Sequence, residues 1–175
     1  MRLFTAIDLP HEVREHLHER LDVLRTLRED LRWVPPTNLH LTVRFIGECG
    51  ARETDRQMEH WAGRCAGIRP FEVSLVGAGC FPHDWLAKVL YAGVNCDPAV
   101  WARLSGGEQS PHVTVARTRV ARDLTGVLQE LADYSSATWH AAEVTMYQSF
   151  LERGRASRYV PLERFELGSG RGVPQ

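Results

Sequence analysis

The stretch that decides the fold is residues 38–45, Asn-Leu-His-Leu-Thr-Val-Arg-Phe, which returns in similar form as residues 110–117, Ser-Pro-His-Val-Thr-Val-Ala-Arg. Each copy alternates His and Thr with apolar, partly β-branched residues, and this pattern predicts a β-strand. Because side chains alternate across a strand, His and Thr leave from one face and the apolar residues from the other. One face can enter a core while the other presents an imidazole beside a hydroxyl.

The duplication matters for chemistry, because the two strands can face each other across a groove if the halves pack about a pseudo-twofold axis. In-line displacement at phosphorus needs a base for the attacking group and an acid for the leaving oxygen, and histidine suits both roles near neutral pH. Hydroxyls can donate to the non-bridging oxygens. We therefore predict His40 and His112 as catalytic acid and base, in an order left open, and Thr42 and Thr114 as phosphate-binding residues.

The paired motifs at residues 40–43 and 112–115 resemble the signature of the two-histidine phosphoesterase superfamily. The longer stretches at residues 31–47 and 111–117 are similar to its bacterial and archaeal RNA 2′,3′-cyclic phosphodiesterase branch, also called 2′-5′ RNA ligase (LigT/ThpR-like). The likeness extends from Arg2 to Leu167. The resemblance implies hydrolysis of RNA 2′,3′-cyclic phosphate termini to 2′-phosphates, with reversible 2′-5′ RNA ligation as a second activity.

Two alternatives stay open. The substrate could be a small cyclic nucleotide, which the nearly neutral surface favours, or the chain could be a non-catalytic module that binds RNA or a nucleotide. The family usually places a longer helix and connector before its second motif, so this chain is shortened on that lobe. A contribution of that insertion to RNA binding would then be missing.

Two arginines are candidates for the phosphate site. The family usually has arginine at the position of Arg117, although strict alternation puts residue 117 on the apolar side of its strand unless a bulge rotates it. By strict alternation, Arg44 lies on the same face of its strand as His40. We predict that Arg117 binds the substrate phosphate and that Arg44 lies at the rim.

Composition indicates one folded unit of modest size. The chain has 175 residues, 43% of them hydrophobic, which suffices for a real core. We predict a single bilobal domain at residues 1–167 and a disordered tail at residues 168–175. No apolar run approaches a membrane span and no secretory pattern opens the chain, so a cytoplasmic protein without membrane contact is expected.

Charge and cysteine usage narrow the partners. A net charge of −1 argues against a broad non-specific nucleic-acid surface, so RNA contact should be local. The four cysteines lack zinc-binding spacing, and no glycine-rich phosphate loop is followed by lysine. We expect no metal and no cofactor, RNA ends or small cyclic nucleotides as substrate, and a monomer without an obligate protein partner.

Periodicity and turn residues give the remaining elements, and Asp8 before Pro10 is interpreted as a helix cap. Besides the two histidine strands, we predict helices at residues 11–27, 53–66, 97–104 and 121–134, strands at residues 3–9, 71–76, 86–94, 141–151 and 158–167, and a loop at residues 77–84. The predicted fold is α+β and bilobal, with two pseudo-symmetric antiparallel β-sheets and outer helices around a central groove.

Overall fold

The computed structural model describes residues 1–170 and shows an α+β fold with two antiparallel sheets, as predicted. The strands are β1 (Arg2–Asp8), β2 (Arg32–Trp33), β3 (His40–Glu48), β4 (Phe71–His83), β5 (Leu86–Asn95), β6 (His112–Arg122), β7 (Trp139–Ala141), β8 (Glu143–Phe150) and β9 (Arg158–Glu166). The helices are α1 (His11–Leu27), α2 (Ala51–Ala66), α3 (Pro98–Ser105) and α4 (Thr125–Leu131), with a 3-10 turn at Pro36–Asn38.

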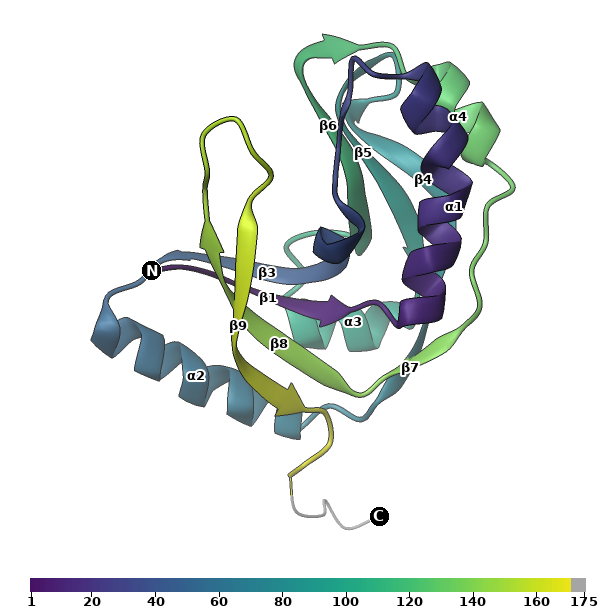
Figure 1. Ribbon diagram of the computed structural model, residues 1–175. Helices are drawn as coiled ribbons and strands as arrows, with labels where there is room; N and C mark the ends of the chain where they lie inside the picture. The colour runs from purple at the N-terminus through teal and green to yellow at the C-terminus, as the bar shows by residue number, and fades with distance from the viewer. Residues whose placement is uncertain (171–175) are drawn as a thin grey trace.

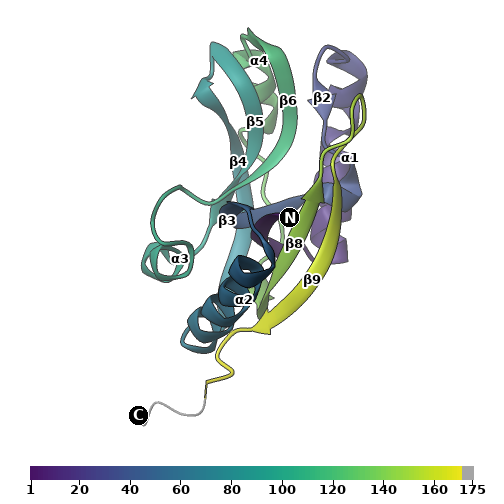
Figure 2. The same ribbon diagram turned by 90° about the vertical axis from the view of Figure 1, so that its left-hand side faces the viewer.

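The two histidine strands belong to different sheets. The first sheet has the order β3-β1-β8-β9 and the second has the order β2-β6-β5-β4-β7 (Figure 1). Seen from the side, β4, β5 and β6 rise on one flank of the molecule, and β8 and β9 rise on the other (Figure 2). Each sheet therefore contributes one copy of the repeated motif.

A short segment links the two motifs directly. β2 pairs with β6, so that Trp33 lies opposite Ala116, and the next amide, that of Val34, donates to the carbonyl of Val115 at 2.9 Å. The chain then passes through the 3-10 turn and enters β3 at His40. Because six residues span at most about 20 Å, this tether keeps the first histidine close to the second motif strand.

Helices cover the sheets from outside. α2 lies along the first sheet and contacts β9 (Figure 1). α1 buries the apolar stripe that its sequence predicts, and it lies beside α4, where Arg20 donates to the carbonyl of Glu130 at 2.8 Å and forms an ion pair with Asp133. A single cluster of buried apolar side chains fills the space between helices and sheets.

Most predicted elements are confirmed, and β8 and β9 lie in the same sheet as β1. The loop predicted at residues 77–84 is wrong, because β4 continues to His83 and pairs with β5 as far as Leu86. The glycines in this stretch suggest a loop. In the structure Gly77, with φ +60°, lies at a register shift between β4 and β5, and the pairing continues after it. The helix predicted at residues 121–134 is shorter, since β6 runs to Arg122.

The C-terminal end of the described chain packs on α2. The amides of Gly168 and Gly170 donate to the carbonyls of Cys65 and Ala66, at 3.0 Å and 3.2 Å. Residues 171–175 of the predicted tail lie outside the described residues.

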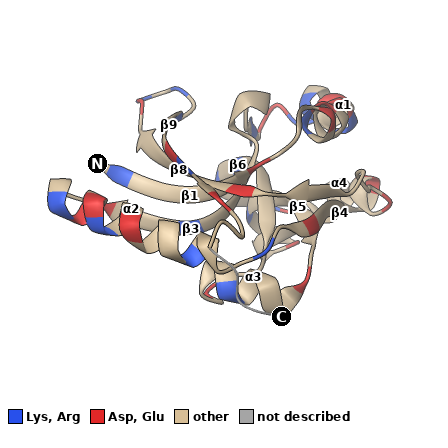
Figure 3. Ribbon diagram, turned by 90° about the horizontal axis from the view of Figure 1, so that it is seen from below, with Lys and Arg blue, Asp and Glu red and all other residues tan. Residues whose placement is uncertain are grey.

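The chain has 21 basic and 22 acidic residues, so neither charge sign is in strong excess. Seen from below, acidic and basic residues alternate along α2 (Figure 3). In the described part of the chain, no helix has the length and apolar character needed to cross a membrane.

Candidate active site

The first histidine is held by hydrogen bonds on both ring nitrogens. Nδ1 of His40 lies 2.7 Å from the carbonyl oxygen of Asn38, and Nε2 lies 2.9 Å from Oγ1 of Thr42. Because a carbonyl oxygen only accepts, Nδ1 carries the proton of the neutral ring and Nε2 accepts from the Thr42 hydroxyl. The basic nitrogen therefore lies beside the threonine of the same motif.

The second histidine repeats the backbone half of this arrangement. Nδ1 of His112 lies 2.8 Å from the carbonyl oxygen of Ser110, again two residues earlier in the chain. Its ring meets Phe81 edge-on, with centroids 5.0 Å apart, and lies 5.4 Å from the ring of Tyr91. Both imidazoles are thus oriented by the same backbone contact, which leaves each Nε2 for chemistry.

Each histidine strand contains a one-residue register shift directly after its threonine. In β3, Thr42 pairs with Ala6 and Arg44 pairs with Thr5, which leaves Val43 as an extra residue. Such a β-bulge reverses the face of the side chains that follow it, up to the next irregularity of the strand.

The same bulge occurs in β6. Thr114 pairs with Tyr91 and Ala116 pairs with Leu90, so that Val115 is the extra residue. Two strands from different sheets therefore share both their histidine geometry and their irregularity, and this supports a common design of the two halves.

The bulges decide the positions of the two candidate arginines. Arg117 shares the face of His112 and Thr114, which meets the condition that its predicted phosphate role required. The face expected for Arg44 is wrong, because the bulge turns this side chain away from the face of His40. There Arg44 forms an ion pair with Glu108 at 2.7 Å.

Aromatic rings surround the first histidine. The ring of Phe4 lies 5.1 Å from that of His40, and Tyr159 lies edge-on at 5.3 Å. Phe45 was placed on the apolar face by alternation, but after the bulge it pairs with Phe4, shares the face of His40 and is 59% exposed. The sequence did not single out Phe4 or Tyr159, since nothing local marks them as neighbours of the motif.

Burial by these rings lowers the pKa of His40 from 6.5 to about 4. The carbonyl of Asn38 and the carboxylate of Asp8 favour the charged imidazole, while the charges of Arg14 and Arg117 oppose it. Desolvation is the largest of these effects, so His40 is neutral at pH 7 and able to accept a proton. The influence of Arg117 also places that guanidinium within electrostatic reach of the first histidine.

Asp8 does not cap a helix, because α1 begins without a side-chain cap. It lies opposite His40 in the β1–β3 pair, and its carboxylate accepts hydrogen bonds from the hydroxyls of Tyr147 and, at 3.2 Å, Thr145. Burial first, and then the Asp8 carboxylate, raise the pKa of Tyr147 well above its usual range. The sequence missed this role, because it depends on a partner at the other end of the chain.

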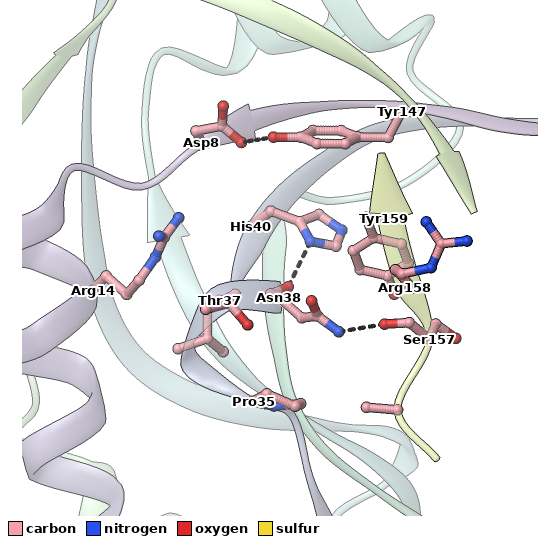
Figure 4. A pocket seen from close by; sticks show the side chains of 12 residues that line it. Asp8, Arg14, Pro35, Thr37, Asn38, His40, Tyr147, Ser157, Arg158 and Tyr159 are labelled. Atoms are coloured by element: carbon pink, nitrogen blue, oxygen red, sulfur yellow. Dashed lines mark hydrogen bonds between the residues drawn. The ribbon is translucent and has the colours of Figure 1, made fainter. Parts of the chain in front are cut away.

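A pocket of about 380 Å³ opens beside His40 (Figure 4). Its walls come from β1, the first turn of α1, the 3-10 turn, and the hairpin between β8 and β9. Arg14 and Arg158 line it on opposite sides. Neither arginine was identified from the sequence, in which Arg14 is one of many polar residues on the helix.

The four cysteines are free thiols, and burial raises the pKa of Cys65 and of Cys80 to about 11. Within residues 1–170, no three His, Cys, Asp or Glu side chains gather in a way that could hold a metal ion.

Two antiparallel sheets that each present a His-x-Thr strand, with both imidazoles oriented through Nδ1, define a two-histidine phosphoesterase. A family model described as LigT like phosphoesterase matches residues 7–91. The RNA 2′,3′-cyclic phosphodiesterase of Escherichia coli (strain K12) is 35% identical to this chain, with 95% of this chain and 96% of the relative covered. The Thermus thermophilus relative of the same name is 32% identical, with 100% and 94% covered. The chain belongs to the LigT-like phosphoesterase family.

Solved structures agree with this assignment. A crystal structure from Thermus thermophilus matches with a TM-score of 0.77 at 26% identity, and the match covers 98% of this chain and 100% of that one. The crystal structure of E. coli LigT complexed with 3′-AMP matches with a TM-score of 0.69 at 30% identity, over 95% and 97% of the two chains. The resemblance inferred from the paired motifs is confirmed.

Proposed function

We propose that this protein hydrolyses RNA 2′,3′-cyclic phosphate ends to 2′-phosphates, with His40 and His112 as general base and general acid. The observation that carries this proposal is the duplicated geometry, in which two imidazoles are each held through Nδ1 and each keep Nε2 for proton transfer. The relatives named RNA 2′,3′-cyclic phosphodiesterase support the substrate class.

The assignment of roles follows from the environment of His40. Nε2 of His40, neutral at pH 7 because its pKa is about 4, takes a proton from water as the water oxygen bonds to phosphorus. The bond between phosphorus and O3′ breaks, and protonated His112 gives its Nε2 proton to O3′. The products are a 2′-phosphate monoester and a 3′-hydroxyl, and the two histidines have exchanged protonation states.

The neighbouring side chains stabilise the charge that develops on phosphate. The hydroxyls of Thr42 and Thr114 donate to non-bridging oxygens, and the Thr42 hydroxyl turns from Nε2 of His40 to do so. Arg117, on the face of the second motif, adds a positive charge near the same oxygens.

Ligation is the same step with another nucleophile. If an RNA 5′-hydroxyl replaces water, its oxygen bonds to phosphorus while the bond to O3′ breaks, and the product is a 2′-5′ linkage. Hydrolysis and ligation therefore need the same acid and base.

The test is turnover of an oligoribonucleotide that ends in a 2′,3′-cyclic phosphate, in excess chelator, with the product phosphate located by chromatography. We expect a 2′-phosphate, and a loss of about a hundredfold to ten-thousandfold in kcat for His40→Ala and for His112→Ala. Because His40 acts as the base, kcat/KM should fall on the acid side as its nitrogen becomes protonated near pH 4. Full activity of either alanine variant contradicts the mechanism.

A further inference from the structure

The pocket beside His40 lies beyond the reacting groups. It is lined by His40 but not by His112, Thr114 or Arg117. Hydrolysis needs only a water molecule at this side of the imidazole, and a water occupies about 30 Å³ of liquid. The pocket, at about 380 Å³, is within the size range of small-molecule sites. It therefore has room for a ligand group in addition to the attacking water.

Arg14 is the charged side chain of this pocket that has no partner within residues 1–170. Its Nε is fully buried without a hydrogen-bond acceptor, and within residues 1–170 its guanidinium forms no ion pair. The carboxylate of the pocket, Asp8, already accepts from Tyr147 and Thr145. A buried, unpaired donor on a cation is costly unless an acceptor completes it. The site is thus prepared for an oxyanion.

The opposite wall carries a second cation. The guanidinium of Arg158 stacks over the ring of Phe150 at 4.1 Å, and its only carboxylate neighbour within residues 1–170 is Glu152, at 3.7 Å. Asn38 donates to the carbonyl of Ser157 at 2.7 Å and so ties this hairpin to the 3-10 turn (Figure 4). The wall is therefore held in place by contacts outside the arginine itself.

The charges of the pocket add up to an excess of one positive charge. Among the lining residues Arg14 and Arg158 are positive, Asp8 is negative and the others apart from His40 carry no charge, while Glu152, the partner of Arg158, lies outside the lining. On a chain with a net charge of −1, this is a local concentration of positive charge next to the first motif. A chain without an overall basic excess can bind a polyanion only through such a local group of cations.

We propose that this pocket is a second phosphate subsite, in which Arg14 and Arg158 bind a phosphodiester one nucleotide away from the reacting phosphorus. This inference rests on the proposed function, since it places the cyclic phosphate end beside His40. The phosphate belongs either to the strand that carries the cyclic end or to a second strand that supplies a 5′-hydroxyl. In both cases two phosphate groups are bound side by side, one at the reacting position and one in the pocket, and RNA is preferred over a mononucleotide.

Calorimetric binding of product analogues tests the subsite without requiring turnover. The first comparison is cytidine 2′-phosphate against a dinucleotide that ends in the same 2′-phosphate and adds one internal phosphodiester. The second comparison is the binding of a nucleoside 3′-phosphate, which has a free 5′-hydroxyl, to protein already saturated with cytidine 2′-phosphate. The variants are Arg14→Gln and Arg14→Lys, with Arg25→Gln as the control on the same helix but outside the pocket.

The two sources of the phosphate give different results. If the phosphate lies on the same strand, the wild type binds the dinucleotide about tenfold more tightly, and Arg14→Gln removes that preference while Arg25→Gln keeps it. If it lies on a second strand, Arg14→Gln instead weakens the nucleoside 3′-phosphate about tenfold. In either case Arg14→Lys should restore part of the effect, because it keeps the charge.

The inference is overturned if Arg14→Gln changes neither comparison relative to Arg25→Gln. A different result would contradict the proposed function, namely that the wild type hydrolyses no RNA with a 2′,3′-cyclic phosphate end, whatever the length of the RNA. Because the binding comparisons need no turnover, the two failures can be told apart in one set of experiments.

Discussion

Replacing His40 by asparagine should remove a pH-dependent part of the free energy of unfolding. In the folded protein the pKa of His40 is lowered from 6.5 to about 4, chiefly by burial of its ring. Between these two pH values the unfolded chain binds more protons than the folded chain, so stability falls as the pH falls. Above about pH 7 the imidazole is neutral in both states, and its contribution is then constant.

The size of the effect follows from the two pKa values. One pKa unit corresponds to 1.36 kcal/mol, so the full loss approaches about 3 kcal/mol at pH 4 and reaches about 2 kcal/mol at pH 5. The asparagine side chain can still donate to the carbonyl of Asn38, but it does not titrate. The variant should therefore lose about 2 kcal/mol less than the wild type between pH 7.5 and pH 5.

Urea denaturation at the two pH values, followed by circular dichroism, measures this difference. Thr42→Val is the matched control, because it removes the hydroxyl at 2.9 Å from Nε2 but keeps the imidazole. It should retain most of the acid-side loss. Equal losses in the wild type and the asparagine variant would refute the argument, because burial would then not disfavour the protonated ring.

Three further predictions concern packing and charge. Gly79→Ala would drive a Cβ into the hydroxyl of Tyr91, whose ring contacts that of His112. Because the displaced ring would shift the histidine, kcat should fall roughly tenfold or more. It should recover when Tyr91→Leu is added. Steady-state kinetics on a cyclic phosphate should show a loss of roughly tenfold to a hundredfold in kcat/KM for Arg117→Gln and a change within about twofold for Arg44→Gln. An equal effect of both would contradict the faces assigned by the bulges. Thr5→Val should raise the free energy of unfolding in urea by about 1 kcal/mol, because the Thr5 hydroxyl is buried without a partner; a lower stability would show that it is satisfied.

Local pattern was sufficient for much of the fold. The apolar stripe from Val13 to Leu24 predicts α1, and it is the face that is buried. The alternation around the two histidines predicts strands whose His and Thr share a face, as the register confirms for Thr114 and His112. These features depend on residues a few positions apart, which is the range that periodicity can report.

Features that depend on distant partners could not be obtained in this way. Asp8 is a plausible helix cap until Tyr147 is brought against it by the pairing of β1 with β8. Arg14 is an ordinary helix residue until the β8–β9 hairpin closes a pocket around it. The continuation of β4 through Gly77 and Gly79 likewise needs β5 beside it to satisfy the backbone.

The bulges limit how far simple alternation holds along each histidine strand. In each strand the extra residue, Val43 or Val115, directly follows the threonine, so alternation holds through the motif and fails after it. The third residue after the threonine then returns to the histidine face, and this position holds Phe45 in one strand and Arg117 in the other. Equivalent positions therefore offer an exposed aromatic ring beside the first motif and a cation beside the second. An aromatic ring can stack on a nucleobase, and a guanidinium can pair with a phosphate. The two halves can therefore share their proton chemistry and still bind the two ends of a nucleotide differently.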